Sequence, residues 1–163
     1  MVGALILLLV LSSCGAPAGD TTTATVIGEP DAPLAPPGSR LRVVAPPATR
    51  IGHTLRYRAD ALELRFADAT VDEGTERAIV EAYLATLAAQ FEGELEHRPF
   101  ALDGSEGLEV TAHGATTRTR VLTVWRDGAI SRLTVVHAPR DAGLAERVIE
   151  TLRFDPSAPL DPR

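Results

Sequence analysis

The alternation of apolar and polar residues predicts three strands at the start of the region that folds. Residues 41–44 form a short apolar run, residues 51–58 are apolar at alternate positions, and residues 62–66 alternate between apolar and charged side chains. Because successive side chains of a strand point to opposite faces, this alternation is typical of half-buried strands. We therefore expect three consecutive strands before the first helix.

The period of the pattern then changes, and residues 71–91 are predicted to form a long helix. Apolar side chains recur there at helical spacing. They include Val80, Leu84, Leu87 and Phe91. Thr70 and Glu73 match a capping box at the start of this helix, and Gly93 matches a stop at its end.

Four further strands and a second helix complete the predicted order. The strands are expected at residues 94–102, 107–112, 117–126 and 129–137. Asp127-Gly128 is a strong signal for a two-residue hairpin between the last two strands. Asp141 is expected to cap the second helix, and Phe154 to close the domain.

The resulting order, β-β-β-α-β-β-β-β-α, predicts an α+β fold with two helices packed on an antiparallel sheet. Residues 41–155 resemble the Mog1/PsbP-like fold, including bacterial DcrB/LpqN-type lipoproteins. The resemblance is carried by the long helix after the first strands, the run of hairpins from Phe100 to Pro139, and the closing segment AERVIETLRF. It implies an accessory or binding role without catalysis. A cystatin-like or NTF2-like fold is the alternative.

The N-terminus predicts a lipoprotein signal peptide. Residues 2–11 form an apolar run that is too short to span a bilayer and has the length of a signal-peptide core. The run ends at Leu11-Ser12-Ser13-Cys14, which resembles the bacterial lipobox. That resemblance implies cleavage after residue 13 and lipid attachment to Cys14. An N-terminal apolar helix with an incidental cysteine is the alternative.

Composition divides the rest of the chain into a tether, one domain and a tail. Residues 14–40 are rich in Pro and Gly and have no periodic apolar face, so we expect a disordered tether. Residues 41–155 are expected to form a single domain, and residues 156–163 a disordered tail. Gly15 follows the lipidated position where an Asp would signal retention in the inner membrane, so an outer-membrane destination is expected.

Charge argues against nucleic acid as a partner. The net charge is −6, and all 16 basic residues are arginine. Phosphate backbones require a basic footprint that this balance does not supply.

Motifs for catalysis, metals and cofactors are missing from the sequence. Ser105 lies in DGSEG, which lacks the spacing of a nucleophile elbow and is typical of a turn. The four histidines lie on separate segments without metal-ligand spacing. They are His53, His97, His113 and His137. We therefore expect no metal, no cofactor and no enzymatic activity.

One cluster of arginines is the candidate binding site. Arg118, Arg120 and Arg126 share a parity on one predicted strand, and Arg132 lies on its hairpin partner. They are interpreted either as solvated charges paired with acids or as a patch for an anionic partner. The sequence therefore predicts a lipid-anchored, non-catalytic binding or accessory module of the bacterial cell envelope. A small envelope hydrolase is the alternative, and partners include the membrane and an envelope protein or anionic component.

Overall fold

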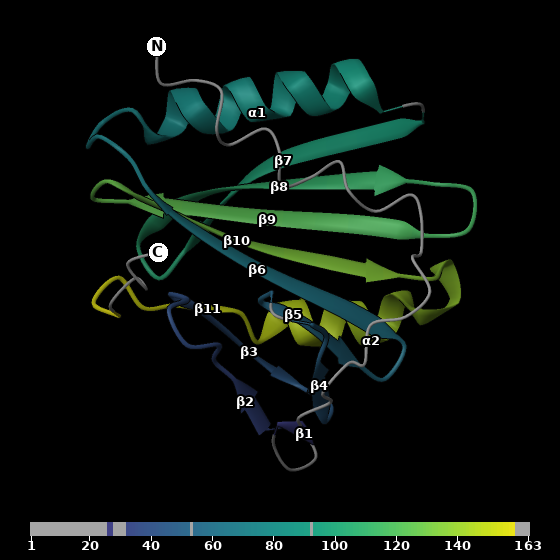
Figure 1. Ribbon diagram of the computed structural model, residues 1–163. Coiled ribbons are helices and arrows are strands. Elements are labelled where there is room, and N and C mark those ends of the chain that lie inside the picture. The colour runs from purple at the N-terminus through teal and green to yellow at the C-terminus, as the bar shows by residue number, and fades with distance from the viewer. Residues whose placement is uncertain (1–25, 28–31, 53, 92, 159–163) are drawn as a thin grey trace.

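The computed structural model describes residues 26–27, 32–52, 54–91 and 93–158 (Figure 1). The expected signal peptide, the lipobox and Cys14 lie outside the described residues. The described part is an α+β structure with antiparallel sheets and two α-helices, which confirms the predicted fold class.

A large antiparallel sheet is the centre of the fold. Its strand order is β1-β4-β5-β6-β10-β9-β8-β7. In that order the strands are Val26–Ile27, Ala48–Arg50, Arg56–Ala59, Leu62–Thr70, Ala129–His137, Arg118–Arg126, Ser105–His113 and Glu94–Leu102. The four strands from β7 to β10 form a meander, and β10 then pairs with β6 from the first part of the chain.

A small second sheet has the order β11-β3-β2, from Arg153–Phe154, Leu41–Ala45 and Ala32–Leu34. It brings the two ends of the folded region together, because β11 follows the last helix while β2 and β3 lie between β1 and β4 near the start of the chain. Phe154 is buried in this sheet, as expected for the residue that closes the domain.

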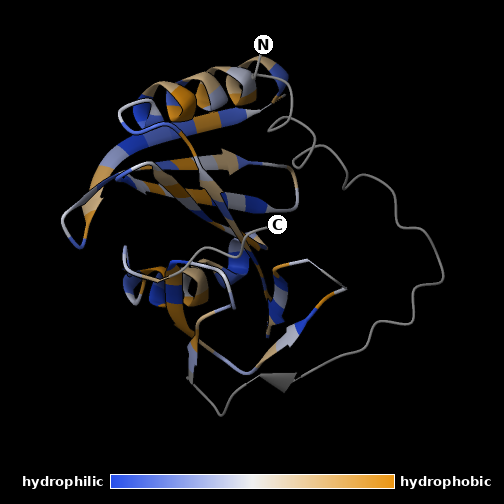
Figure 2. Ribbon diagram, turned by 60° about the vertical axis from the view of Figure 1, so that its left-hand side comes forward, coloured by the Kyte–Doolittle hydropathy of each residue, from blue (hydrophilic) through white to orange (hydrophobic). Residues whose placement is uncertain are grey.

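The two helices lie on opposite faces of the large sheet (Figure 1). The helix α1, Glu76–Gln90, covers one face, and α2, Ala142–Glu150, lies on the other beside the small sheet. A short 3-10 turn, Pro139–Asp141, leads into α2. Figure 2 shows apolar and polar residues alternating along the strands between the helices.

The main core lies on the α2 face. There the apolar side of the large sheet packs against α2 and the small sheet. Its members include Tyr57, Leu64, Leu122, Leu133, Val135, Ala145 and Val148. Full burial of a leucine or valine side chain, as at several of these positions, is worth about 1.5–3 kcal/mol. By contrast, α1 buries only Glu76 and Val80, so this helix is held by far less contact.

Two-residue turns fix the registers of the hairpins. Asp127 and Gly128 both have positive φ, at 50° and 71°, and they pair Arg126 with Ala129 across β9 and β10. This geometry is the primed turn that matches the twist of the flanking strands. The predicted hairpin and both of its strands are confirmed.

The start of α1 differs from the prediction. Thr70 does not cap a helix, because it is the last residue of β6 and pairs with Ala129. The ladder continues one residue further, where the Val71 N–H donates to the Gly128 carbonyl at 2.8 Å. A turn through Gly74, with φ of 84°, then leads to the N-cap Thr75. Strand pairing therefore takes the residues that local pattern assigned to a helix.

The predicted strand at residues 51–58 is wrong in its first half, because only its last three residues belong to a strand. The chain instead forms β4 up to Arg50 and resumes in β5 at Arg56, with Gly52 at a φ of 64° between them. The Ile51 N–H donates to the Arg56 carbonyl at 2.7 Å across this bend.

The N-terminal boundary of the domain is also corrected. Within the expected tether, β2 pairs with β3, and Leu34 is 3% exposed and belongs to the main core. Folded structure therefore begins before residue 41. At the other end, the Arg40 Nε donates to the Ala158 carbonyl at 3.1 Å, so residues 156–158 are tied to the domain. Residues 159–163 lie outside the described residues.

Across the described ranges, no helix has the length and apolar character needed to cross a membrane.

Candidate functional site

A cavity of about 300 Å³ opens on the α2 face, at the end of the large sheet where β8 turns into β9. It is formed by β7 to β10 and by the start of α2. Its lining residues are Glu96, His97, Arg98, Glu109, Thr111, His113, Arg118, Arg120, His137, Ala142 and Glu146. The lining is dominated by side chains that carry charge or donate hydrogen bonds.

Strand register places Arg118 between two histidines. Arg118 on β9 is the direct partner of His113 on β8 and of His137 on β10. Directly opposed residues on one face of a sheet have Cβ atoms about 4.5–5.5 Å apart. The three side chains therefore form one row across three strands, which we call the His-Arg-His row.

Arg118 has no hydrogen-bond or ion-pair partner among the described residues. It is half-buried, and it is the one arginine of the pocket without such a partner in that part of the chain. Beside it, the His113 Nε2 is buried without a hydrogen bond and lies 3.9 Å from the Glu96 carboxylate. On the other side His137 is 3% exposed, and its Nδ1 lies 2.8 Å from the Ala138 carbonyl oxygen.

The neighbouring arginines of the pocket are already occupied. Arg98 donates to one oxygen of Glu109 at 2.7 Å, and Arg120 donates to the other oxygen at 2.7 Å. Arg120 also pairs with Glu146 on α2. The Glu109 side chain is only 6% exposed, so two guanidinium groups compensate a buried carboxylate. This network joins β7, β8, β9 and α2 and forms one wall of the pocket.

Formal charges in the pocket balance apart from its histidines. Three arginines, Arg98, Arg118 and Arg120, face three glutamates. Two of the glutamates, Glu109 and Glu146, pair with arginine, and the third, Glu96, is 66% exposed and lies nearest to His113. Arg118 is thus a cation without a partner among the described residues, in a pocket whose arginines and glutamates balance only when Arg118 is counted.

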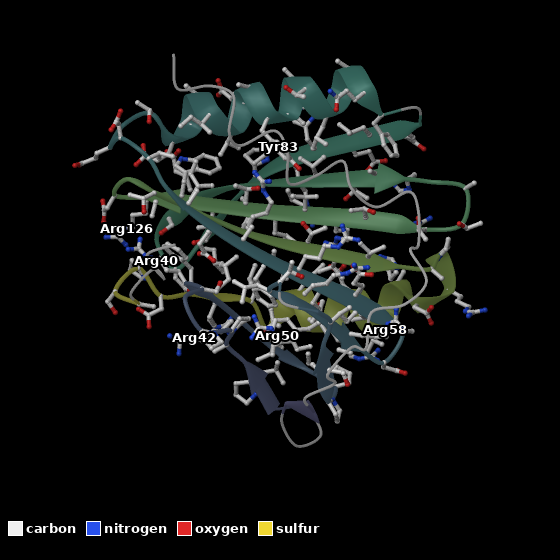
Figure 3. All side chains as sticks on the ribbon, in the orientation of Figure 1. Arg40, Arg42, Arg50, Arg58, Tyr83 and Arg126 are labelled. Atoms are coloured by element: carbon white, nitrogen blue, oxygen red, sulfur yellow. The ribbon has the colours of Figure 1, made fainter. Side chains whose placement is uncertain are left out.

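The four arginines predicted as one cluster do not form one surface. Arg118, Arg120 and Arg126 do share a face, but the ends of β9 lie about 26 Å apart at roughly 3.3 Å per residue. Figure 3 shows Arg126 at the opposite end of the sheet from the β8–β9 turn, and its Nε lies 3.2 Å from Asp127. α2 packs over the middle of the shared face, on Leu122 and its neighbours.

Arg132 lies on the opposite face of the sheet. It is paired with Thr123 in the register of β9 and β10, out of phase with Leu133 on the main core. Its guanidinium carbon is 3.9 Å from the ring centroid of Tyr83 on α1. The sequence of one strand shows which of its own residues share a face. The register between β9 and β10 was needed to show that Arg132 lies on the other face.

Other residues singled out in the sequence do not join this site. Ser105 begins β8, where it is 3% exposed with its Oγ unpaired, and it does not line the pocket. His53 lies outside the described residues. Within the described ranges, no three His, Cys, Asp or Glu side chains are grouped so that they could hold a metal ion.

A second cavity, of about 450 Å³, lies on the other face beneath α1. Its walls are mostly apolar and come from α1, β7, β8 and β9. They include Val80, Leu84, Pro99, Leu108 and Trp125, with the ion pair between Arg77 and Glu106 beside them. This cavity reflects the loose packing of α1.

No protein-family model matches the sequence, and a search of curated proteins finds no relative.

Proposed function

We propose that this protein is a lipid-anchored, non-catalytic binding module of the bacterial cell envelope. The observation that carries the binding role is Arg118, a half-buried guanidinium without a partner among the described residues, which lines an open cavity. Arginines that serve only the fold are normally compensated, as Arg98 and Arg120 are here by Glu109. An uncompensated one that faces a cavity is a group available to a ligand.

The anchoring role rests on Leu11-Ser12-Ser13-Cys14, which resembles a lipobox directly after an apolar run. A lipoprotein carries at least two acyl chains, and two chains hold a protein stably where one holds it only marginally. On this proposal Cys14 is the first residue of the mature protein. The stretch between Cys14 and β1 then links the domain to the lipid, at the outer membrane.

We also propose that the fold is a variant of the Mog1/PsbP-like fold. A long helix after the first strands, a hairpin meander and a closing helix that leads into Phe154 support this assignment. The additional sheet of β11, β3 and β2 is the feature that a comparison of structures would have to match.

Anchoring is tested by metabolic labelling with a fatty acid in a bacterial host. We expect the wild-type chain to incorporate the label and to fractionate with membranes. The Cys14→Ser variant should remain unlabelled and keep its signal peptide. Mass spectrometry that finds Met1 retained, or Cys14 unmodified, in the membrane-bound wild-type protein would refute the anchor.

Binding is tested with the mature chain, residues 14–163, carrying Cys14→Ser so that lipid does not mask the result. This chain contains every described residue. We expect envelope fractions to retain it, and Arg118→Gln to reduce retention. Arg126→Gln is the matched control, because Arg126 shares the strand and face but lies outside the pocket. Equal retention of the parent chain and Arg118→Gln would contradict the proposed site.

A further inference from the structure

We infer that the His-Arg-His row binds a single carboxylate group of a small ligand or of a chain end. This inference rests on the proposed binding function and names the ligand chemistry of the same pocket. It is based on the charges that the pocket leaves uncompensated, on the side chains that surround Arg118, and on the acids at the rim.

Arg118 supplies the charge that selects an anion. A guanidinium group is always ionised, and its planar fork of donors matches the two oxygens of a carboxylate. In this pocket the guanidinium groups of Arg98 and Arg120 donate to Glu109. The guanidinium of Arg118 makes no hydrogen bond or ion pair with any described residue. Because Arg118 is half-buried, an anion that reaches it meets a partly desolvated cation, which strengthens the interaction over an exposed pair.

Additional donors surround the same position. The His113 Nε2 is buried, without a hydrogen-bond partner, on the strand next to Arg118. A ligand oxygen placed between the two side chains would satisfy this nitrogen. Ala142, the first residue of α2, also lines the cavity. The amino end of a helix carries partial positive charge, so it adds to the preference for an anion set by Arg118.

Acids at the rim limit the charge of the ligand to one. Glu96 and Glu146 line the pocket with side chains that are 66% and 51% exposed, so they face any group at its mouth. A negative group placed close to these carboxylates is repelled by them, which costs free energy of binding. A polyanion would meet these two carboxylates after satisfying Arg118.

A carboxylate fits this balance better than a phosphate. A phosphate monoester carries about −1.5 to −2 charges at neutral pH and three acceptor oxygens. The pocket offers one guanidinium without a partner in the described part of the chain, which matches one charge and two oxygens. The carboxylate can come from a free small acid or from the C-terminus of a peptide, since both present the same group.

Nuclear magnetic resonance titration of the mature chain tests this inference. The probes are acetate, the peptide Ac-Ala-Ala-Ala with a free carboxylate, the same peptide as its C-terminal amide, and inorganic triphosphate. We expect saturable shifts of the backbone amides of His113, Arg118 and His137 with the two carboxylates. The peptide with a C-terminal amide should produce no such shifts, and triphosphate should bind more weakly than the two carboxylates.

Variants assign the effect to Arg118. Arg118→Gln should weaken carboxylate binding by about tenfold or more, the range for loss of a charge-assisted hydrogen bond. Arg118→Lys keeps the charge but not the fork and should weaken it less, whereas Arg126→Gln should bind as the parent does. An unchanged amide spectrum away from the pocket shows that each variant is folded. Tighter binding of the peptide than of acetate supports a chain end as the source, and equal binding supports a small acid.

Several results would overturn the inference. They are the absence of saturable shifts with either carboxylate, equal binding of the peptide amide, tighter binding of triphosphate, or shifts that survive Arg118→Gln. Failure here is distinguishable from failure of the proposed function. Retention on envelope fractions that depends on Arg118, without carboxylate binding, would keep the binding module and reject the ligand class.

Discussion

The guanidinium of Arg132 lies over the ring of Tyr83, with its central carbon 3.9 Å from the ring centroid. This contact joins β10 to α1, and Figure 3 shows Tyr83 on that helix. The Arg132 Nε is buried without a hydrogen-bond partner, and burial lowers the pKa of this guanidinium because its charged form is desolvated. Arg132 as a whole is half-buried, so the ring compensates the desolvation of the buried part of its charge.

We predict that Arg132→Met stabilises the protein or leaves its stability unchanged. A cation–π contact returns about 0.5–2 kcal/mol, and we expect the desolvation of a cation without a carboxylate partner to cost more than that. The free energy of unfolding, measured in urea, should rise by about 1 kcal/mol, since Met fills a similar space without charge. Arg126→Met serves as the exposed control. A loss of stability for Arg132→Met would show that the contact with Tyr83 outweighs desolvation.

Glu109 is predicted to be the most important carboxylate for stability. It is 6% exposed and bridges Arg98 and Arg120, of which Arg120 is 11% exposed. Glu109→Gln should therefore lower the free energy of unfolding by about 2–4 kcal/mol, because the largely buried Arg120 loses one of its two carboxylate partners and Arg98 loses its own.

Glu106 on the same strand provides the matched control for Glu109. It also pairs with an arginine, Arg77, but the two side chains are 59% and 63% exposed. Glu106→Gln should change stability by less than about 1 kcal/mol. If the two variants were equally stable, the network around Glu109 would not contribute as described.

A third prediction concerns pH and the start of α1. The Glu76 carboxylate accepts a hydrogen bond from the Gly128 N–H at 2.6 Å. Its own backbone N–H and that of Gly128 hold the pKa of Glu76 below its ordinary value. A lowered pKa in the folded state stabilises the protein at pH values above the ordinary pKa. This contribution is lost as the pH falls through the pKa of the folded state.

The comparison of the parent chain with Glu76→Gln isolates this contribution. The difference in free energy of unfolding should be largest near neutral pH and should shrink as the pH falls below about 4.5, near the ordinary pKa of Glu. A difference that stayed constant across this range would mean that Glu76 titrates alike in both states.

The corrected N-terminal boundary gives a fourth prediction. Leu34 is 3% exposed on β2 and packs in the main core. Leu34→Ala should lower the free energy of unfolding by about 2–4 kcal/mol, through lost burial and the cavity left behind. Ala35→Ser is the control, because Ala35 is exposed. Equal stability of the two variants would show that residues 32–34 do not contribute to the folded domain.

The sequence predicted the elements that depend on local pattern. The hairpin at Asp127-Gly128 follows from two residues that accept positive φ, and the strands on either side alternate as strands do. The small second sheet could not be predicted in this way. β2 has three residues and β11 has two, and each is a strand only because β3 lies between them.

The candidate site could be predicted in part. The turn pairs Arg126 with Ala129, so counting back along both strands pairs Arg118 with His137. The prediction used only the parity of residues on one strand and did not count across the hairpin. The count across the hairpin was the available signal for the pocket. The approach of β8 with His113, and the position of α2 over the middle of the face, depend on long-range packing that no local pattern specifies.

We propose that this pocket binds a carboxylate ligand without converting it. The direct measurement incubates the mature chain, or its Arg118→Gln variant, with an extract of envelope peptides and small acids. Mass spectrometry then follows bound and free species over time. We expect a carboxylate-bearing species to be enriched on the parent chain, to be lost with Arg118→Gln, and to keep its mass. Steady conversion of an envelope component into a cleaved product by the parent chain would instead identify a hydrolase and contradict a non-catalytic role.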